Sequence, residues 1–125
     1  MVLDDLTFEI RGAAFTVHKE LGPGLLESVY EGALALELME NGLSVRRQVG
    51  VPVIYREVDL DLGFRIDLLV EEKIIVEIKS VQLIQDVHKK QLLTYLRLSE
   101  KKVGLLFNFN SSYLKDKESI FRIVN

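Results

Sequence analysis

The sequence contains no cysteine, which excludes disulfide bonds and thiolate metal sites. It also lacks any apolar run approaching the roughly 20 residues that a membrane helix needs. The N-terminal stretch MVLDDLTFEI is acidic and has neither the basic start nor the apolar middle of a signal peptide. We therefore expect a cytoplasmic protein with no membrane partner.

Positive charge is also in deficit, because the formal net charge is −3. This balance argues against a protein whose whole surface binds nucleic acid, but it does not exclude a local basic groove. The hydrophobic fraction of 48% and the charged fraction of 28% are ordinary for a soluble globular protein. With 125 residues the chain is long enough for one hydrophobic core, so we expect a single domain over residues 1–125.

Helical and strand-like patterns alternate along the chain. A helix is predicted over 4–20, where apolar side chains recur every three or four residues, at Leu6, Ile10, Ala13, Val17 and Leu21. The sequence LGPG ends this helix, and a second helix is predicted from about residue 25 to residue 40. The other predicted elements are strands at 44–55, 61–70 and 73–80, a helix over 84–99, and strands at 102–109 and 119–124.

The order of these elements predicts an α/β fold of the α+β kind. The first three strands follow one another closely enough to form an antiparallel meander. The connection between the third and fourth strands is long enough for a helical crossover, so we expect the fourth strand to lie parallel to the third. Gly50 and Pro52 indicate that the first strand has a bulge or lies at an edge of the sheet.

The third strand is strongly apolar, and yet it carries Glu77 and Lys79. Side chains alternate along a strand, so these two residues share a face with Ile75. Charged residues are almost never fully buried unless they are paired. The two charges therefore need either a partner or a function.

The second strand places Asp67 beside these two charges. One register buries the apolar faces of both strands, with Val70 opposite Ile74, Leu68 opposite Val76 and Ile66 opposite Ile78. This register puts Asp67 directly across from Glu77, with their Cβ atoms roughly 4.5–5.5 Å apart. The turn would then be Glu71-Glu72-Lys73, which lacks the glycine that such turns prefer.

Two carboxylates that close repel each other, so one is driven to protonate unless a cation lies between them. A hard divalent ion such as Mg²⁺ takes oxygen ligands and is often held by one or two carboxylates together with substrate phosphates. Lys79 could direct its ammonium group at the same place and hold an attacking water or stabilise charge in a transition state. The alternative is a salt bridge of Lys79 with Asp67 or Glu77 at the edge of the sheet.

The predicted second helix carries a carboxylate on a mostly apolar face. Glu27 shares this face with Tyr30, Leu34 and Leu38. A place in the first turn, near the positive end of the helix dipole, would explain the charge of Glu27. It does not explain the side on which Glu27 lies, because Glu31 could fill the same role without facing the core.

The predicted helix over 84–99 has Val87, Gln91, Tyr95 and Leu98 on one side. His88, Gln91 and Tyr95 are spaced three and then four residues apart, and side chains with this spacing can line a cleft. A lone histidine is more often a satisfied surface or core residue than a metal ligand. No second histidine is spaced to join His88.

Several stretches of the sequence resemble the GxxExxY family of the PD-(D/E)XK nuclease-like superfamily. GLLESVY, residues 24–30, is similar to the signature that names the family, with Gly24, Glu27 and Tyr30 at the named positions. FRIDLLVEEKIIVEIKSV resembles the central hairpin of the family, and VHKKQLLTYL and VGLLFNF resemble its helix and following strand. The resemblance extends over roughly residues 7–124.

The resemblance implies a restriction-endonuclease-like core of a helix, a three-stranded meander, a crossover helix and a further strand. It also implies that Asp67 and Glu77 are metal-binding acids and that Lys79 is the lysine of the superfamily motif. Glu27 corresponds to an acid found on the helix of many members. The proline that gives the motif its first letter is absent, because Ile66 precedes Asp67.

The resemblance further implies that Gln91 and Tyr95 form an auxiliary motif on the crossover helix. We therefore expect a nuclease that depends on Mg²⁺ or Mn²⁺ and hydrolyses phosphodiester bonds of DNA or RNA. In this hypothesis the acids named above bind the metal, with the backbone carbonyl of Ile78 as an extra ligand, and Lys79 acts in catalysis.

Two other interpretations stay open at this point. The chain could be a non-catalytic nuclease-fold protein that binds nucleic acid or a protein partner, or a structural domain with a vestigial site. A homodimer would suit so small a nuclease domain, because one copy cannot easily enclose a duplex.

Overall fold

The structure is a computed structural model that describes residues 1–125. Its elements follow in the order α1 Leu3–Leu21, α2 Glu27–Glu40, β1 Val45–Tyr55, β2 Val58–Val70, β3 Ile74–Lys79, α3 Asp86–Ser99, β4 Val103–Asn108 and β5 Ile120–Val124. Each predicted helix and strand is present. β2 begins earlier than predicted because it continues into a long hairpin with β1.

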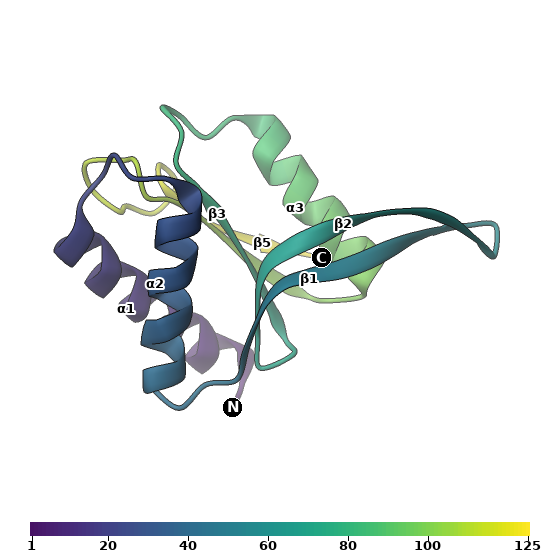
Figure 1. Ribbon diagram of the computed structural model, residues 1–125, viewed down its shortest axis with the longest axis horizontal. Helices are drawn as coiled ribbons and strands as arrows, with labels where there is room; N and C mark the ends of the chain where they lie inside the picture. Colours follow the sequence, from purple (N-terminus) through teal and green to yellow (C-terminus); the bar gives the residue numbers. More distant parts are fainter.

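The five strands form one sheet in the order β1-β2-β3-β4-β5. β1, β2 and β3 make the predicted antiparallel meander, and α3 crosses over so that β4 pairs with β3 in parallel. β5 adds an antiparallel strand at the far edge. α1 and α2 cover one face of the sheet, and α3 covers the other (Figure 1). This arrangement confirms the predicted fold class.

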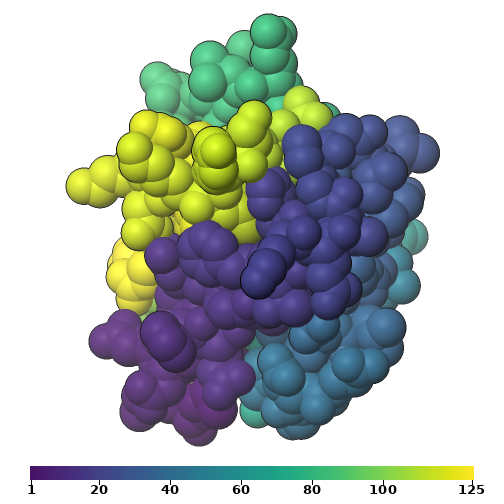
Figure 2. Space-filling model, turned by 90° about the vertical axis from the view of Figure 1, so that its left-hand side faces the viewer, coloured from purple at the N-terminus to yellow at the C-terminus, as the bar shows by residue number.

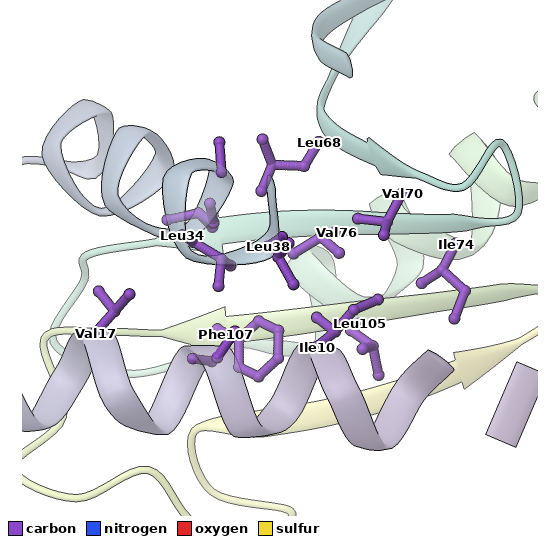
Figure 3. Packing of buried hydrophobic residues seen from close by; sticks show 14 of the residues in the cluster. Ile10, Val17, Leu34, Leu38, Leu68, Val70, Ile74, Val76, Leu105 and Phe107 are labelled. Carbon is purple, nitrogen blue, oxygen red and sulfur yellow. The ribbon is translucent and has the colours of Figure 1, made fainter. Parts of the chain in front are cut away.

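Two apolar layers hold the sheet between its helices. The larger layer packs α1 and α2 against the sheet through side chains such as Ile10, Leu34, Leu38, Val76 and Phe107 (Figure 3). On its outer side α1 and α2 lie against each other, with the segment after β4 alongside (Figure 2). The buried face of α1 matches the prediction except at Leu21, which ends the helix and is 41% exposed.

The smaller apolar layer lies under α3. Leu92 and Leu96 are buried, whereas Val87 and Leu98 are exposed. The helix carries apolar residues on more than one side, so periodicity alone does not choose between them. Packing against Leu106 and the other apolar side chains on this face of the sheet selects the side that contains Leu92 and Leu96.

The turn between β2 and β3 is the predicted one, and it has no glycine. Glu71 and Glu72 both have a φ of 54°, in the left-handed region that non-glycine residues rarely adopt. Contacts with the start of β1 compensate for this conformation. Glu71 accepts a hydrogen bond from the backbone N–H of Ser44 at 2.6 Å, and Glu72 binds Arg46 through two hydrogen bonds of 2.7 Å.

β2 and β3 pair in the predicted register, with Val70 opposite Ile74 and Leu68 opposite Val76. The pairing of β2 with β3 ends at Leu68 and Val76, and the predicted pairing of Ile66 with Ile78 was wrong. Ile66 does not pair with Ile78 but packs in the layer under α3. Because Leu68 belongs to the layer under α1 and α2, the alternation of buried side chains along β2 inverts at Asp67.

The alternation of buried side chains along β1 also inverts, opposite the inversion in β2. Val45 packs on the side of α1 and α2, whereas Val49 packs on the side of α3. Between them lies Gln48, whose φ is 51°. A single residue with positive φ rotates the strand that follows it, so that the later side chains exchange faces of the sheet. Since Arg47 pairs with Leu68 and the residue after Gln48 pairs with Ile66, Gln48 lies opposite the inversion in β2.

Beyond this point β1 and β2 form a two-stranded arm, residues 51–63, that projects past the end of α3 (Figure 1). Its pairing is irregular between Pro52 and Ile54, and β1 is an edge strand, as Gly50 and Pro52 predicted. Gly63 allows a close approach, because a Cβ there would lie 2.5 Å from the carbonyl oxygen of Val51. Five apolar side chains of the arm are 43–69% exposed: Ile54, Tyr55, Val58, Leu60 and Leu62.

Candidate functional site

Asp67 and Glu77 meet where β2 and β3 separate. The backbone N–H of Asp67 donates to Glu77 Oε1 at 3.2 Å, and the backbone N–H of Ile78 donates to Asp67 Oδ2 at 2.8 Å. These two bonds continue the connection between the strands beyond their last backbone pair, Leu68 opposite Val76. The separation of the strands therefore brings the two carboxyl groups together in the gap.

Glu77 is 5% exposed. Its burial, and next the negative charge of Asp67, raise the pKa of Glu77 from 4.5 to about 9. At neutral pH Glu77 is therefore protonated, and the pair carries one negative charge instead of two. A cation between the two groups would favour the ionised form of both, so the pair is suited to exchange its proton for a metal ion.

Lys79 is half-buried at the end of β3, two residues beyond Glu77. The salt bridge with Asp67 or Glu77 that the sequence left open does not form. The positive charge is nevertheless close enough to lower the pKa of Glu77, against the larger effects that raise it. The ammonium group thus stays free to bind a ligand beside the acids.

A third carboxylate reaches this region from α2, and it belongs to Glu31. Glu31 is 6% exposed and accepts hydrogen bonds from Arg47 at 2.9 and 3.2 Å and from the Gln48 amide. The same amide nitrogen lies 3.4 Å from Asp67 Oδ1. The prediction that Glu31 faces away from the core was wrong. The buried side of α2 includes Glu31 and Ala35 as well as Tyr30, Leu34 and Leu38, so it is wider than the face predicted from the last three residues.

Glu27 is the first residue of α2 and is exposed. The loop before it is held by the Tyr30 hydroxyl, which donates to the Gly22 carbonyl at 2.5 Å and accepts from the Leu25 N–H at 3.1 Å. The Ser80 hydroxyl, directly after β3, donates to the Leu25 carbonyl at 2.6 Å. These bonds hold the start of α2 against the end of β3, and Glu27 with it.

Tyr95 of α3 lies toward the acids. Burial, and next the negative charges of Glu77 and Asp67, raise the pKa of its hydroxyl above the usual value. Its ring stacks on Phe64 of β2, with a centroid distance of 4.0 Å and an angle of 7° between the planes. This stack fixes the ring, so the hydroxyl has a defined place near the pair of acids.

The other two residues of α3 that the sequence predicted to line a cleft, His88 and Gln91, make no hydrogen bond to the acids. Gln91 is exposed. His88 accepts a hydrogen bond from the backbone N–H of Gln85 through Nδ1, at 2.9 Å. His88 is therefore satisfied within the first turn of its own helix, as expected for a lone histidine.

The oxygen donors at the break between the strands fit a hard divalent cation. Asp67 and Glu77 offer carboxylate oxygens, and Ile78, whose backbone N–H binds Asp67, also carries a backbone carbonyl in the same strand. No further histidine, aspartate or glutamate lies close enough to Asp67 and Glu77 to form a cluster of three ligands. Mg²⁺ does not need one, because it usually keeps several waters and takes oxygens from substrate phosphates.

The contribution of Gln48 and Glu31 was not predicted. Nothing in the sequence of β1 marks Gln48, because positive φ is more typical of asparagine, aspartate and glycine. Glu31 did leave a signal, since it lies three and four residues before Leu34 and Ala35, both of which are buried.

Comparison with known proteins relates the whole chain to one group. The family model of the PD-(D/E)XK nuclease superfamily matches residues 4–123. No curated protein and no solved structure gives a significant match. None of the helices combines the length and the apolar character that a membrane span requires.

Proposed function

The chain belongs to the PD-(D/E)XK nuclease superfamily, and we propose that it is a single-domain nuclease that uses Mg²⁺ or Mn²⁺ to hydrolyse phosphodiester bonds of DNA or RNA. The observation that carries this proposal is the contact of Asp67 with buried Glu77 at the break between β2 and β3. A pair of acids that must share one charge is a suitable place for a divalent cation.

In the proposed site Asp67 and Glu77 hold the metal, and the Ile78 carbonyl is an extra ligand. Glu27 does not form a cluster with these acids, but the loop before it is bound to the end of β3, and it would supply a further carboxylate at the edge of the site. When bound, the ion lowers the pKa of water and stabilises negative charge on the phosphoryl oxygens.

Lys79 and Tyr95 beside the acids, and Gln91 further out on α3, would act on the substrate. Lys79 orients the attacking water or stabilises the negative charge that develops during hydrolysis. Tyrosine hydroxyls are protonated at neutral pH, and the pKa of Tyr95 is raised further by burial and the nearby acids, so its hydroxyl can donate a hydrogen bond to a phosphate. Gln91, exposed one turn before Tyr95, contacts the nucleic acid backbone.

The test is cleavage of labelled single- and double-stranded DNA and RNA with Mg²⁺ or Mn²⁺. Lys79→Ala and Glu77→Ala should lose cleavage and keep the circular dichroism of the folded wild type. Lys19→Ala, which removes an exposed lysine in the last turn of α1 that has no part in the proposed site, is the matched control and should cleave normally. Cleavage unchanged in the first two variants would exclude the proposed mechanism.

The second candidate is a non-catalytic nuclease-fold protein that binds nucleic acid or a protein partner. The observation that favours it is that only two acids converge. It predicts no turnover with any metal and a salt-sensitive affinity for nucleic acid that survives Lys79→Ala. The cleavage assay above, followed by filter binding at two salt concentrations, separates the two candidates.

Within the superfamily we infer that the chain is a GxxExxY protein. The supporting observation is that the first and last named residues shape the loop before α2. Gly24 has a φ of 98°, which favours glycine, and Tyr30 is fully buried with its hydroxyl bound to the same loop. Glu27 between them has no such structural role and is available for chemistry.

We also infer a homodimer in which two arms pair. Pairing would cover the five apolar side chains of each arm that are 43–69% exposed, and a specific interface built on them must bury at least about 1,000 Å². Sedimentation should show a dimer that Leu62→Lys dissociates and Leu36→Lys, on exposed α2 surface, does not. A wild-type monomer would contradict this inference.

A further inference from the structure

Gln48 combines an unusual backbone conformation with a place beside the acids. Its φ of 51° is in the left-handed region, although it lies within β1. Long side chains such as glutamine rarely adopt this conformation. Residues held in such conformations persist only where the surroundings impose them, and they cluster at functional sites. The contacts of the Gln48 side chain should therefore account for its left-handed conformation.

The conformation turns the side chain of Gln48 toward α2. Arg47 already points to this side, where it binds Glu31. In a regular strand the next side chain would lie on the opposite face, the side of α3. The positive φ instead lets the Gln48 amide reach Glu31 as well. The alternation inverts after Gln48, and Val49 then packs under α3.

The amide of Gln48 lies between two carboxylates. Its nitrogen donates to Glu31 Oε1 and lies 3.4 Å from Asp67 Oδ1. An amide nitrogen carries two protons, so one group can serve both acids. Glu31 is held in turn by two hydrogen bonds from Arg47. The amide is therefore anchored on the α2 side and presents a donor to Asp67 from β1.

Asp67 is thus held from both of its neighbouring strands. Its Oδ2 accepts the backbone N–H of Ile78 in β3, and its Oδ1 faces the amide of Gln48 in β1. The carboxyl group of Glu77 accepts the backbone N–H of Asp67 and also interacts with the Asp67 side chain, so Gln48 supplies the contact on the β1 side. Loss of the Gln48 donor would free one oxygen and allow the carboxylate to rotate.

We propose that Gln48 is a positioning residue that orients the Asp67 carboxylate for metal binding. It acts through Asp67 and touches neither the metal nor the substrate. The inference rests on the proposed function, because it assigns Gln48 to the same metal site. It also gives a reason for the left-handed conformation, since only that conformation brings the amide between Glu31 and Asp67.

The test compares Gln48→Gly and Gln48→Asn with the wild type. Glycine accepts the positive φ and removes the amide, whereas asparagine tolerates the same φ but shortens the reach by one methylene group. Glu57→Gly is the matched control, because Glu57 also has a positive φ, of 66°, and lies at the exposed tip of the arm. Mn²⁺ affinity is measured by calorimetry, and the thermal midpoint is measured in chelator.

We expect both Gln48 variants to fold with midpoints close to or above that of the wild type. Their Mn²⁺ affinity should fall roughly 10- to 100-fold, as for other residues that orient metal ligands, while Glu57→Gly keeps its affinity. Cleavage by the Gln48 variants should fall at limiting metal and recover at saturating metal, which a general loss of structure would not produce.

Two results would overturn the inference in distinguishable ways. Wild-type Mn²⁺ affinity in both Gln48 variants would show that Asp67 needs no positioning by this residue, and the proposed metal site would stand. A wild type that binds no Mn²⁺ at all would remove the proposed function, and this inference with it.

Discussion

Replacing Glu77 by glutamine should stabilise the protein, and by an amount that depends on pH. The carboxyl group of Glu77 is buried beside Asp67, and these surroundings raise its pKa from 4.5 to about 9. Glutamine has nearly the shape of a protonated glutamate and no proton to lose. The substitution Glu77→Gln therefore removes the titration and preserves most of the packing.

The direction in which stability changes with pH follows from the number of protons that the folded and the unfolded chain bind. Between pH 4.5 and about pH 9 the folded chain keeps the proton of Glu77 and the unfolded chain releases it. The free energy of unfolding of the wild type thus falls as pH rises. Each pH unit corresponds to about 1.4 kcal/mol, so the wild type at neutral pH has lost about 3 kcal/mol of the stability that Glu77 contributes in acid. Glu77→Gln undergoes no such loss.

The assay is urea unfolding of both proteins in chelator, followed by circular dichroism at four pH values from about 4.5 to about 8.5. The stability of Glu77→Gln minus that of the wild type should rise steadily across this range. The control is Glu57→Gln, the same change at an exposed carboxylate of the arm, for which the difference should stay constant with pH.

A difference between Glu77→Gln and the wild type that does not change with pH would refute the reasoning. It would mean that Glu77 ionises as it does in the unfolded chain, and that burial and the charge of Asp67 do not hold its proton. Asp67 and Glu77 would then have no shared proton to exchange for a metal ion.

Three further predictions test other parts of the structure. Because Glu77 is protonated at neutral pH, Mn²⁺ binding should release about one proton, measured as a binding enthalpy that depends on the buffer; an enthalpy independent of the buffer would contradict it. Tyr30→Phe should lower the free energy of unfolding by about 1–3 kcal/mol, because the ring stays buried and both hydrogen bonds to the Gly22–Leu25 loop are lost; unchanged urea unfolding would show that water replaces them. Gly104→Ala should destabilise by about 1–3 kcal/mol, because its Cβ would lie 2.8–3.1 Å from the side chain of Leu92; a wild-type thermal midpoint would show that α3 adjusts.

The proximity of Asp67 to Glu77 followed from the sequence because it depends on two strands joined by a short turn. Burying the apolar side chains of both strands leaves one register, which the pairing of Leu68 with Val76 confirms. The lack of glycine in the turn argued against this register. The turn nevertheless forms without glycine, because Glu71 and Glu72 make hydrogen bonds to residues at the start of β1.

Helix faces were harder to predict because each helix carries apolar residues on more than one side. The periodicity of α3 allowed Val87 and Leu98 to be buried, and contact with the sheet buried Leu92 and Leu96 instead. On α2 the same ambiguity hid Glu31. Its burial became possible only because Arg47, sixteen residues further along the chain, supplies a positive charge.

The local pattern of the chain was enough for the order of the elements, the parallel crossover and the meeting of Asp67 with Glu77, because each of these depends on neighbouring segments and on the two-residue period of a strand. Folding in three dimensions decided the rest. The left-handed conformation of Gln48 and the pKa of Glu77 depend on contacts among α2, β1, β2 and β3. Such contacts combine burial, charge and hydrogen bonding from several segments at once, and no periodicity within one segment encodes them.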